Sequence, residues 1–204
     1  MHFVITSYGN DYVPLLAVCL DSLRREHAGD PVTVIWDDTS PMEVAWLRAG
    51  FPDVEFRQIT LAISSHNVHE RIPLKLRAWA AFLASAGEGL FCFLDSDTLV
   101  YRNIASYMGS EFDILFTWKD EKIPLNTGVI AVRNSVFVRE FFALWQRETE
   151  AIVNDPARLT EACAQLGAAD QAALFSLLRT RDYTEAVRRD FSFGSILFQG
   201  VSCA

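Results

Sequence analysis

The sequence lacks the features that mark a membrane protein or a nucleic-acid-binding protein. Its uninterrupted apolar runs, such as Leu90 to Leu94, are far shorter than the roughly 20 residues of a membrane-spanning helix. Acidic residues outnumber basic ones by 26 to 18, which gives a formal net charge of −8. The average field of such a chain repels nucleic acids and anionic membranes. We therefore expect no transmembrane segment and no nucleic-acid partner.

Secretion signals and cysteine motifs are missing as well. The first residues turn polar at Thr6 and lack the basic region and long apolar core of a secretory signal. The four cysteines, at positions 19, 92, 163 and 203, show no CxxC spacing. Cys19 and Cys92 lie among apolar neighbours, as small buried hydrophobic residues do. These absences predict a cytoplasmic protein whose cysteines are structural.

Apolar segments of strand length alternate with segments of helical periodicity, and no linker-like stretch interrupts them. We expect strands at Phe3 to Ile5, Val32 to Trp36, Val54 to Ile59, Leu90 to Leu94, Asp113 to Trp118 and Gly128 to Val132. Helices are expected near Pro14, after a Ser40 N-cap, from Pro73 to Gly87, from Val136 to about Ile152, and from Gln171 to about Leu178. The fourth helix should turn four apolar side chains inward, Phe137, Phe141, Leu144 and Trp145. This order predicts one α/β domain over residues 1–204, with an open, mostly parallel central sheet flanked by helices. Ligands of such a sheet bind beyond the carboxyl ends of its strands.

Two carboxylates follow the most apolar strand, in the segment Asp95-Ser96-Asp97. Residues two apart in an extended segment point the same way, so both carboxylates should reach one site at the sheet edge. Two neighbouring anions repel each other unless a cation compensates them. Mg²⁺ or Mn²⁺ suits such oxygen ligands and completes its shell with water and phosphate oxygens. The alternative is a plain surface turn, in which aspartate and serine are common.

Two later segments turn this pattern into a resemblance. They are Leu125-Asn126-Thr127-Gly128, which runs on into Arg133-Asn134-Ser135, and Ala169-Asp170-Gln171-Ala172. In this order the motifs resemble those of retaining nucleotide-sugar transferases of the GT-A fold. The likeness extends to glycogenin and the lipopolysaccharide galactosyltransferases, and equally to a related group of xylosyl-, galactosyl- and mannosyltransferases.

The resemblance implies a set of site residues. Asp95 and Asp97 would bind the metal and the diphosphate of a UDP-sugar with Ser96 between them, and Lys75 on the preceding helix would assist. Tyr12 looks like the tyrosine that stacks on the nucleotide base. The family usually completes its metal site with a histidine near the C-terminus, but histidine occurs here only at positions 2, 27, 66 and 69. Either the domain is truncated at its C-terminus or the third protein ligand differs.

The remaining candidates each have a structural alternative. Thr6 and Tyr8 end the first strand, where they frame a base or cover the rim of the sheet. Asp37 accepts a ribose hydroxyl or caps a turn. Lys75 binds phosphate or is solvated on a helix face, and Arg71 and Arg77 are alternatives to it. Asn126 precedes Gly128, whose missing side chain indicates either a close approach to the sugar or a β-bulge.

Asp170 and Gln171 open a helix, and two readings remain for them. Asp170 either lies beside the sugar, where it is the one candidate nucleophile, or serves as the helix N-cap. Gln171 belongs to the catalytic group by the same resemblance. A front-face substitution, in which the leaving phosphate deprotonates the acceptor, needs no nucleophile.

The predicted function is metal-dependent transfer of a sugar from a UDP-sugar to a hydroxyl acceptor such as a saccharide, with retention at the anomeric carbon. One alternative is a non-catalytic nucleotide-sugar-binding module. Another is a phosphatase of the haloacid dehalogenase type, whose nucleophile motif is also Asp-x-Asp. That motif normally follows the first strand and has threonine two residues on, whereas here three strands precede it and Thr98 follows at once.

Overall fold

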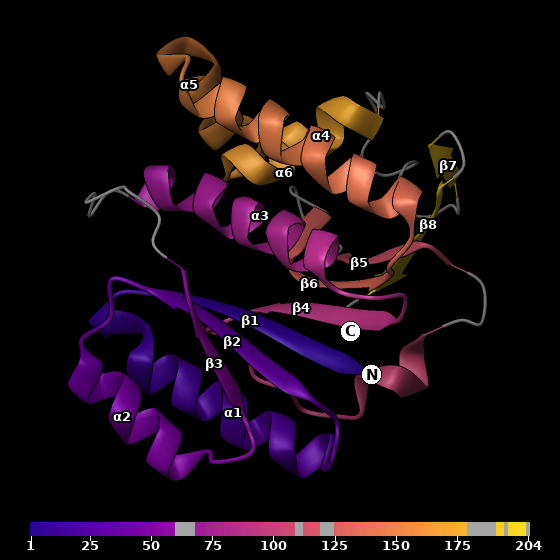
Figure 1. Ribbon diagram of the computed structural model, residues 1–204. Coiled ribbons are helices and arrows are strands. Elements are labelled where there is room, and N and C mark those ends of the chain that lie inside the picture. The colour runs from indigo at the N-terminus through magenta and orange to yellow at the C-terminus, as the bar shows by residue number, and fades with distance from the viewer. Residues whose placement is uncertain (60–67, 109–111, 119–124, 179–190, 194–195, 203–204) are drawn as a thin grey trace.

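A single mixed sheet forms the centre of the molecule in the computed structural model, which describes residues 1–59, 68–108, 112–118, 125–178, 191–193 and 196–202 (Figure 1). The strands are β1 (His2–Tyr8), β2 (Val32–Asp37), β3 (Glu55–Gln58), β4 (Leu90–Asp95), β5 (Ile114–Trp118), β6 (Leu125–Arg133), β7 (Phe191–Phe193) and β8 (Ile196–Ser202). Their order across the sheet is β3-β2-β1-β4-β6-β5-β8-β7. All six expected strands are present, with ends shifted by a few residues.

The described strands make four parallel and three antiparallel pairings. Strands β3, β2, β1 and β4 pair with one another in parallel, and β5 is parallel to β8. Strand β6 runs antiparallel between β4 and β5. The expected open, mostly parallel sheet is confirmed, with two reversed strands, β6 and β7, that apolar patterning does not predict.

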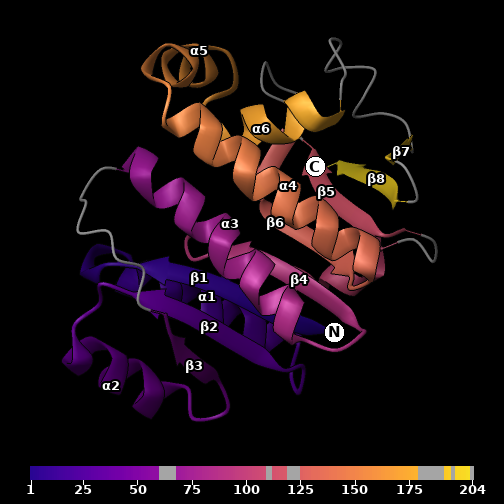
Figure 2. The ribbon, with the colours of Figure 1, turned by 45° about the horizontal axis from the view of Figure 1, so that its top comes forward.

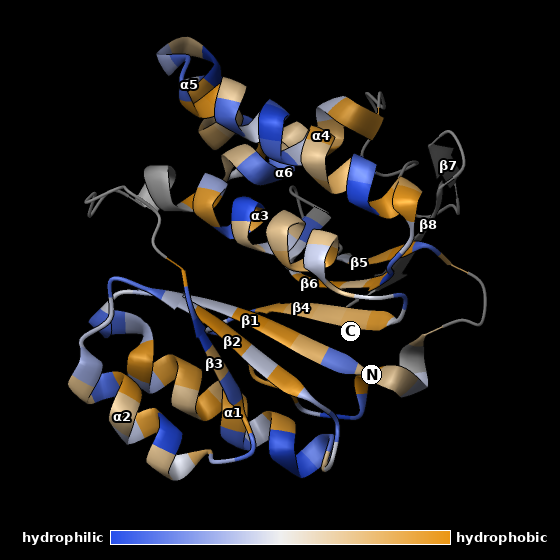
Figure 3. Ribbon diagram, viewed as in Figure 1, coloured by the Kyte–Doolittle hydropathy of each residue, from blue (hydrophilic) through white to orange (hydrophobic). Residues whose placement is uncertain are grey.

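The sheet separates two apolar cores because successive side chains of a strand point to opposite faces. Phe3, Ile5 and Leu94 pack toward α1 (Val13–Glu26) and α2 (Pro41–Gly50). Val4 and Phe93 pack on the other face, toward α3 (Val68–Ser85), α4 (Val136–Val153) and α6 (Ala169–Leu178). Figure 3 shows the apolar strands enclosed between these two layers of helices. The strand ends therefore carry the polar groups that face solvent.

Local sequence signals set several helix boundaries. Ser40 caps α2, since its hydroxyl accepts a hydrogen bond from the Glu43 amide at 3.2 Å, as expected. The expected start of the third helix at Pro73 is wrong, because α3 begins at Val68 and holds Pro73 inside it. A proline there removes one helical hydrogen bond without ending the helix. An additional helix, α5 (Pro156–Leu166), precedes α6 and is capped by Asp155.

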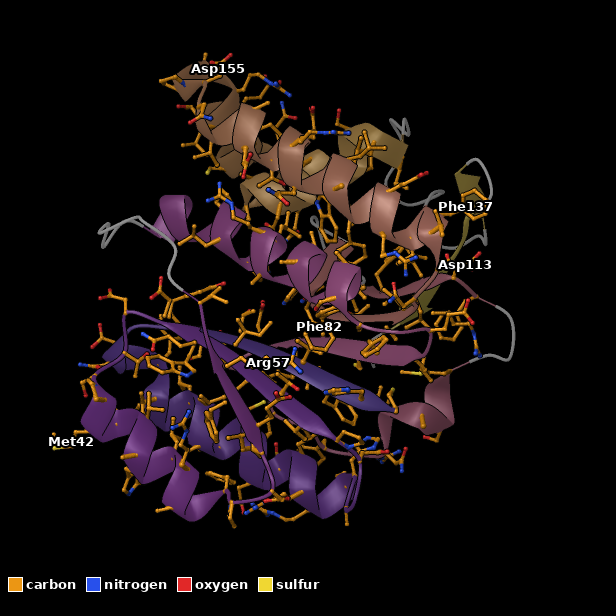
Figure 4. All side chains as sticks on the ribbon, in the orientation of Figure 1. Met42, Arg57, Phe82, Asp113, Phe137 and Asp155 are labelled. Atoms are coloured by element: carbon orange, nitrogen blue, oxygen red, sulfur yellow. The ribbon has the colours of Figure 1, made fainter. Side chains whose placement is uncertain are left out.

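Helices α3 and α4 run side by side across one face of the sheet (Figure 2). Phe141 and Trp145 of α4 are buried there as expected, and so is Phe142. The expectation for Phe137 is wrong: it is 51 % exposed and lies at the outer side of the first turn of α4 (Figure 4). The inward position one turn before Phe141 and Phe142 is taken by Val138, which is fully buried, so the neighbouring Phe137 turns outward.

Asn134, in the segment after β6, ties the end of α3 to the sheet. Its side-chain amide donates hydrogen bonds to the carbonyls of Leu83, Ala86 and Gly87 at 3.1, 3.2 and 3.0 Å. These carbonyls belong to the last turn of a helix and to the residues after it, where intrahelical partners run out. Asn134 thus fixes α3, and with it the helix that carries Lys75.

Among the described residues, no helix combines the length and the apolar character that a membrane crossing requires. Cys19 and Cys92 are buried thiols, as expected, whereas Cys163 is half-buried. Cys203 lies outside the described residues.

Candidate functional site

A pocket opens at the carboxyl ends of β1 and β4, two neighbouring parallel strands of the sheet. In the register of these strands Thr6 lies opposite Asp95. The residues that line the pocket are Thr6, Tyr8, Tyr12, Ile72, Lys75, Asp95, Ser96 and Asp97. All but Ile72 are candidates from the sequence. The fold thus brings together candidates that come from three separate segments of the chain.

The two aspartates reach the pocket by a turn rather than by an extended segment. Strand β4 ends at Asp95, and Ser96 and Asp97 form a turn in which the Thr98 amide donates to the Asp95 carbonyl at 3.1 Å. The expectation that both carboxylates share one face of an extended strand is therefore wrong. The alternative of a surface turn describes the backbone of this segment, and the same turn lines the pocket. Asp97 is exposed, and the Asp95 side chain is 34 % exposed.

Lys75 of α3 joins the pocket to the protein interior. Its ammonium lies 3.2 Å from Asp95 Oδ1 and 3.1 Å from Asp170 Oδ2, and 5.0 Å from the centre of the Trp79 ring. Its side chain is only 13 % exposed, which rules out the alternative of a solvated lysine. Burial acts to lower the pKa of Lys75, but the carboxylates of Asp170 and Asp95 outweigh it and raise that pKa above its usual range. The ammonium is charged at every physiological pH.

Asp170 lies beneath the pocket and does not line it. It is 2 % exposed, and its Oδ2 accepts a hydrogen bond from the Thr127 hydroxyl at 2.6 Å. The Trp145 indole donates to its backbone carbonyl at 2.8 Å. Burial acts to raise the pKa of Asp170, but the Lys75 charge and the hydrogen bonds to the carboxylate outweigh it and lower that pKa. Asp170 is not an N-cap, because α6 begins one residue earlier, at Ala169.

The segment around Gly128 contains a bulge, and its backbone lies close to the Asp95 carboxylate. The pairing of β5 with β6 shifts register between Phe116 and Thr117 at this point. Asn126 Oδ1 accepts a hydrogen bond from the Gly128 amide at 2.7 Å. A Cβ at Gly128 would lie 2.9 Å from Asn126 Oδ1 and 3.1 Å from Asp95 Oδ2. The absence of a side chain at Gly128 therefore leaves room for the Asp95 carboxylate.

The remaining candidates surround this centre. Tyr8 pairs in register with Asp37 of β2, and burial, followed by the charges of Asp37 and Asp95, raises its pKa above the usual range. Asp37 lines a separate, neighbouring hollow at the ends of β2 and β3, together with Arg48 and Gln58. Gln171 is half-buried beside Asp170 in the first turn of α6.

The charges around the pocket fit a divalent cation. Three carboxylates, of Asp95, Asp97 and Asp170, face one ammonium, which leaves two net negative charges. Burial raises the pKa of Asp95; Lys75 opposes this shift, while Asp170 and Asp97 add to it. An added cation would relieve this repulsion, and carboxylate oxygens are ligands that Mg²⁺ and Mn²⁺ accept.

The described residues hold no cluster of three or more histidine, cysteine or acidic side chains arranged for a metal. His2 and His27 are bonded to Thr33 and Asp30 instead. The side chains of His66 and His69 lie outside the described residues. A cation at Asp95 and Asp97 would thus take much of its shell from water and phosphate oxygens, as Mg²⁺ commonly does.

Comparison with known proteins relates the fold to sugar transferases. No family model and no curated protein matches the chain. Among solved structures, the glycosyltransferase GlyE of Streptococcus pneumoniae TIGR4 is 12 % identical with a TM-score of 0.61. The alignment covers 98 % of this chain but 44 % of GlyE, so the chain spans less than half the length of that protein.

Two further structures are matched over most of their own length. The galactosyltransferase LgtC, solved with donor and acceptor sugar analogues, is 14 % identical with a TM-score of 0.59, over 100 % of this chain and 87 % of LgtC. A putative nucleotide-diphospho-sugar transferase of Desulfovibrio desulfuricans G20 is 12 % identical with a TM-score of 0.52, over 98 % and 79 % of the two chains. The chain therefore has the GT-A fold of nucleotide-sugar transferases, as its motifs predict.

Proposed function

We propose that this protein transfers a sugar from a nucleoside-diphosphate sugar, most simply a UDP-sugar, to a hydroxyl acceptor such as a saccharide, with the help of a divalent cation. The observation that carries the proposal is the pocket at the ends of β1 and β4. It gathers two carboxylates, one buried ammonium and two tyrosines at the edge of the sheet. In open α/β sheets this edge is where ligands bind.

The residues of the pocket suit the two halves of a nucleotide. Asp95 and Asp97 would hold Mn²⁺ or Mg²⁺, with Ser96 between them and Lys75 within reach of the phosphates. When bound, the cation would supply positive charge that stabilises the departing diphosphate. Thr6, Tyr8 and Tyr12 line the same pocket and would frame the base. Asp37, in the adjoining hollow, would accept a ribose hydroxyl.

We propose that transfer proceeds with retention at the anomeric carbon, by a front-face substitution. A covalent route needs a carboxylate within bonding reach of the sugar. Asp170, the candidate for that role, is 2 % exposed, does not line the pocket and already accepts hydrogen bonds at Oδ2. We therefore assign the acceptor proton to the leaving phosphate. Asn126 and Gln171 would orient the sugar hydroxyls.

The test is release of nucleoside diphosphate from a panel of UDP-, GDP- and ADP-linked sugars, with Mn²⁺ and a mixture of saccharide acceptors. The proposal expects release from at least one UDP-sugar and loss of that release in Asp97→Asn. Binding of UDP without release from any donor would instead establish a non-catalytic nucleotide-sugar-binding module. Absence of both binding and release would refute the proposal.

A further inference from the structure

Thr127 of β6 donates a hydrogen bond to the buried carboxylate that supports Lys75. Its hydroxyl lies 2.6 Å from Asp170 Oδ2, and the same oxygen lies 3.1 Å from the Lys75 ammonium. Thr127 is 3 % exposed and Asp170 is 2 % exposed. Two donors from different elements thus meet at one carboxylate oxygen that water does not reach.

These contacts form a chain that runs from the core to the pocket. Thr127 binds Asp170, Asp170 binds Lys75, and Lys75 binds Asp95 at 3.2 Å. The Trp145 indole holds the Asp170 backbone from the other side. Figure 1 shows α3 and α6, which carry Lys75 and Asp170, on the same side of the sheet to which β6 belongs. An ammonium has three N–H donors, so two ion pairs leave one donor of Lys75 for a ligand in the pocket.

A hydroxyl at position 127 is not needed to build the strand. Valine has nearly the same shape as threonine, is equally β-branched and is favoured in buried strands. What valine lacks is the donor to Asp170. Without it, the carboxylate loses one of the contacts that fix its orientation, and Lys75 is free to move toward Asp95 alone. The ammonium would then neutralise the aspartate that faces the ligand rather than serve the ligand itself.

We propose that Thr127 is a positioning residue, which acts through Asp170 to hold the Lys75 ammonium where it meets the donor diphosphate. This inference rests on the proposed function. It assigns Asp170 a supporting role inside the protein, one step removed from the sugar. The part of the donor whose binding depends on Thr127 is the diphosphate.

The experiment measures UDP binding by calorimetry in the presence of Mn²⁺ for the full chain and its variants. Thr127→Val is expected to weaken binding roughly tenfold, the scale of one hydrogen bond to a charged group. Thr127→Ser keeps the hydroxyl and should bind within about twofold of the parent, well below the effect of a lost hydrogen bond. Thr33→Val is the matched control, since the Thr33 hydroxyl bonds Glu55 at the opposite end of the parallel strands. It should leave UDP binding unchanged.

A double-mutant cycle separates positioning from a general structural role. In a Lys75→Met background, Thr127→Val should weaken UDP binding no further, because its effect passes through Lys75. Equal binding by Thr127→Val and the parent, or an undiminished loss in the Lys75→Met background, overturns the inference while the proposed function stands. If Thr127→Val does not fold, the Thr127→Ala and Thr127→Ser pair gives the same contrast. Failure of the parent to bind UDP overturns both proposals.

Discussion

Lys75 and Asp170, far apart in the sequence, form an ion pair directly under the candidate pocket, with the ammonium 3.1 Å from the carboxylate oxygen. Such a pair is costly to desolvate and is retained where both charges have further partners. Here Thr127 supplies a second donor to Asp170, and Asp95 supplies a second carboxylate to Lys75. The pair links the interior of the α/β fold to the groups that would meet a nucleotide.

Removal of the Asp170 charge should make the free energy of unfolding less dependent on pH in the acidic range. The lowered pKa of Asp170 means that its ionised form stabilises the fold above about pH 4, and that this contribution is lost as pH falls through the lowered value. Asp170→Asn should therefore cost about 3 kcal/mol of unfolding free energy at pH 7, and progressively less toward pH 3. Urea unfolding of both proteins across this range measures the difference. A gap that is constant with pH would show that the Asp170 charge does not contribute.

Gly128 should be required for the geometry of the pocket. In Gly128→Ala the new methyl group would meet Asn126 Oδ1 at 2.9 Å and Asp95 Oδ2 at 3.1 Å, so one of these groups must shift. We expect UDP binding with Mn²⁺ to weaken at least about tenfold, the equivalent of roughly 1.4 kcal/mol. Gly50→Ala is the control, because nothing lies within 4 Å of a Cβ there and the change lies in helix α2. If both variants bind alike, Gly128 does not shape the site.

Asn134 should contribute to stability rather than to binding. Asn134→Ala removes the hydrogen bonds to three carbonyls at the end of α3 and leaves these carbonyls without that donor. The expected loss is about 2 to 3 kcal/mol of unfolding free energy, measured by urea denaturation. Gln165→Ala, which removes only an exposed bond to Glu161, should cost less than about 0.5 kcal/mol. Comparable losses in the two variants would show that Asn134 does not anchor the helix.

The sequence predicts the pocket better than it predicts what lies beneath it. A continuous apolar run at Leu90 to Leu94 identifies a central strand, and polar residues directly after it must lie at the sheet edge. That argument places Asp95 and Asp97 at the sheet edge, and the later motifs favour a site there over a plain surface turn. The antiparallel direction of β6 cannot be predicted in this way, because apolar patterning is the same for a strand of either direction.

Asp170 and Thr127 show why the interior could not be predicted. An aspartate near the start of a helix is most often an N-cap, and only the tertiary contact with Lys75 shows its burial. Threonine in a strand looks the same whether its hydroxyl is bonded or not. Similarly, Pro73 indicates a helix start, but α3 begins at Val68 and continues through the proline.

Mn²⁺-dependent stabilisation by UDP tests the central claim most directly. Thermal unfolding is followed with UDP, with Mn²⁺ and with both, for the parent, for Asp97→Asn, and for Asp21→Asn as a control in an exposed ion pair with Arg25. With ligand at about 100 times its dissociation constant, the parent and Asp21→Asn should gain roughly 5 °C or more only when both ligands are present, and Asp97→Asn should gain none. An equal gain in Asp97→Asn, or a gain from UDP that does not need Mn²⁺, would contradict a cation held by these aspartates at the donor site.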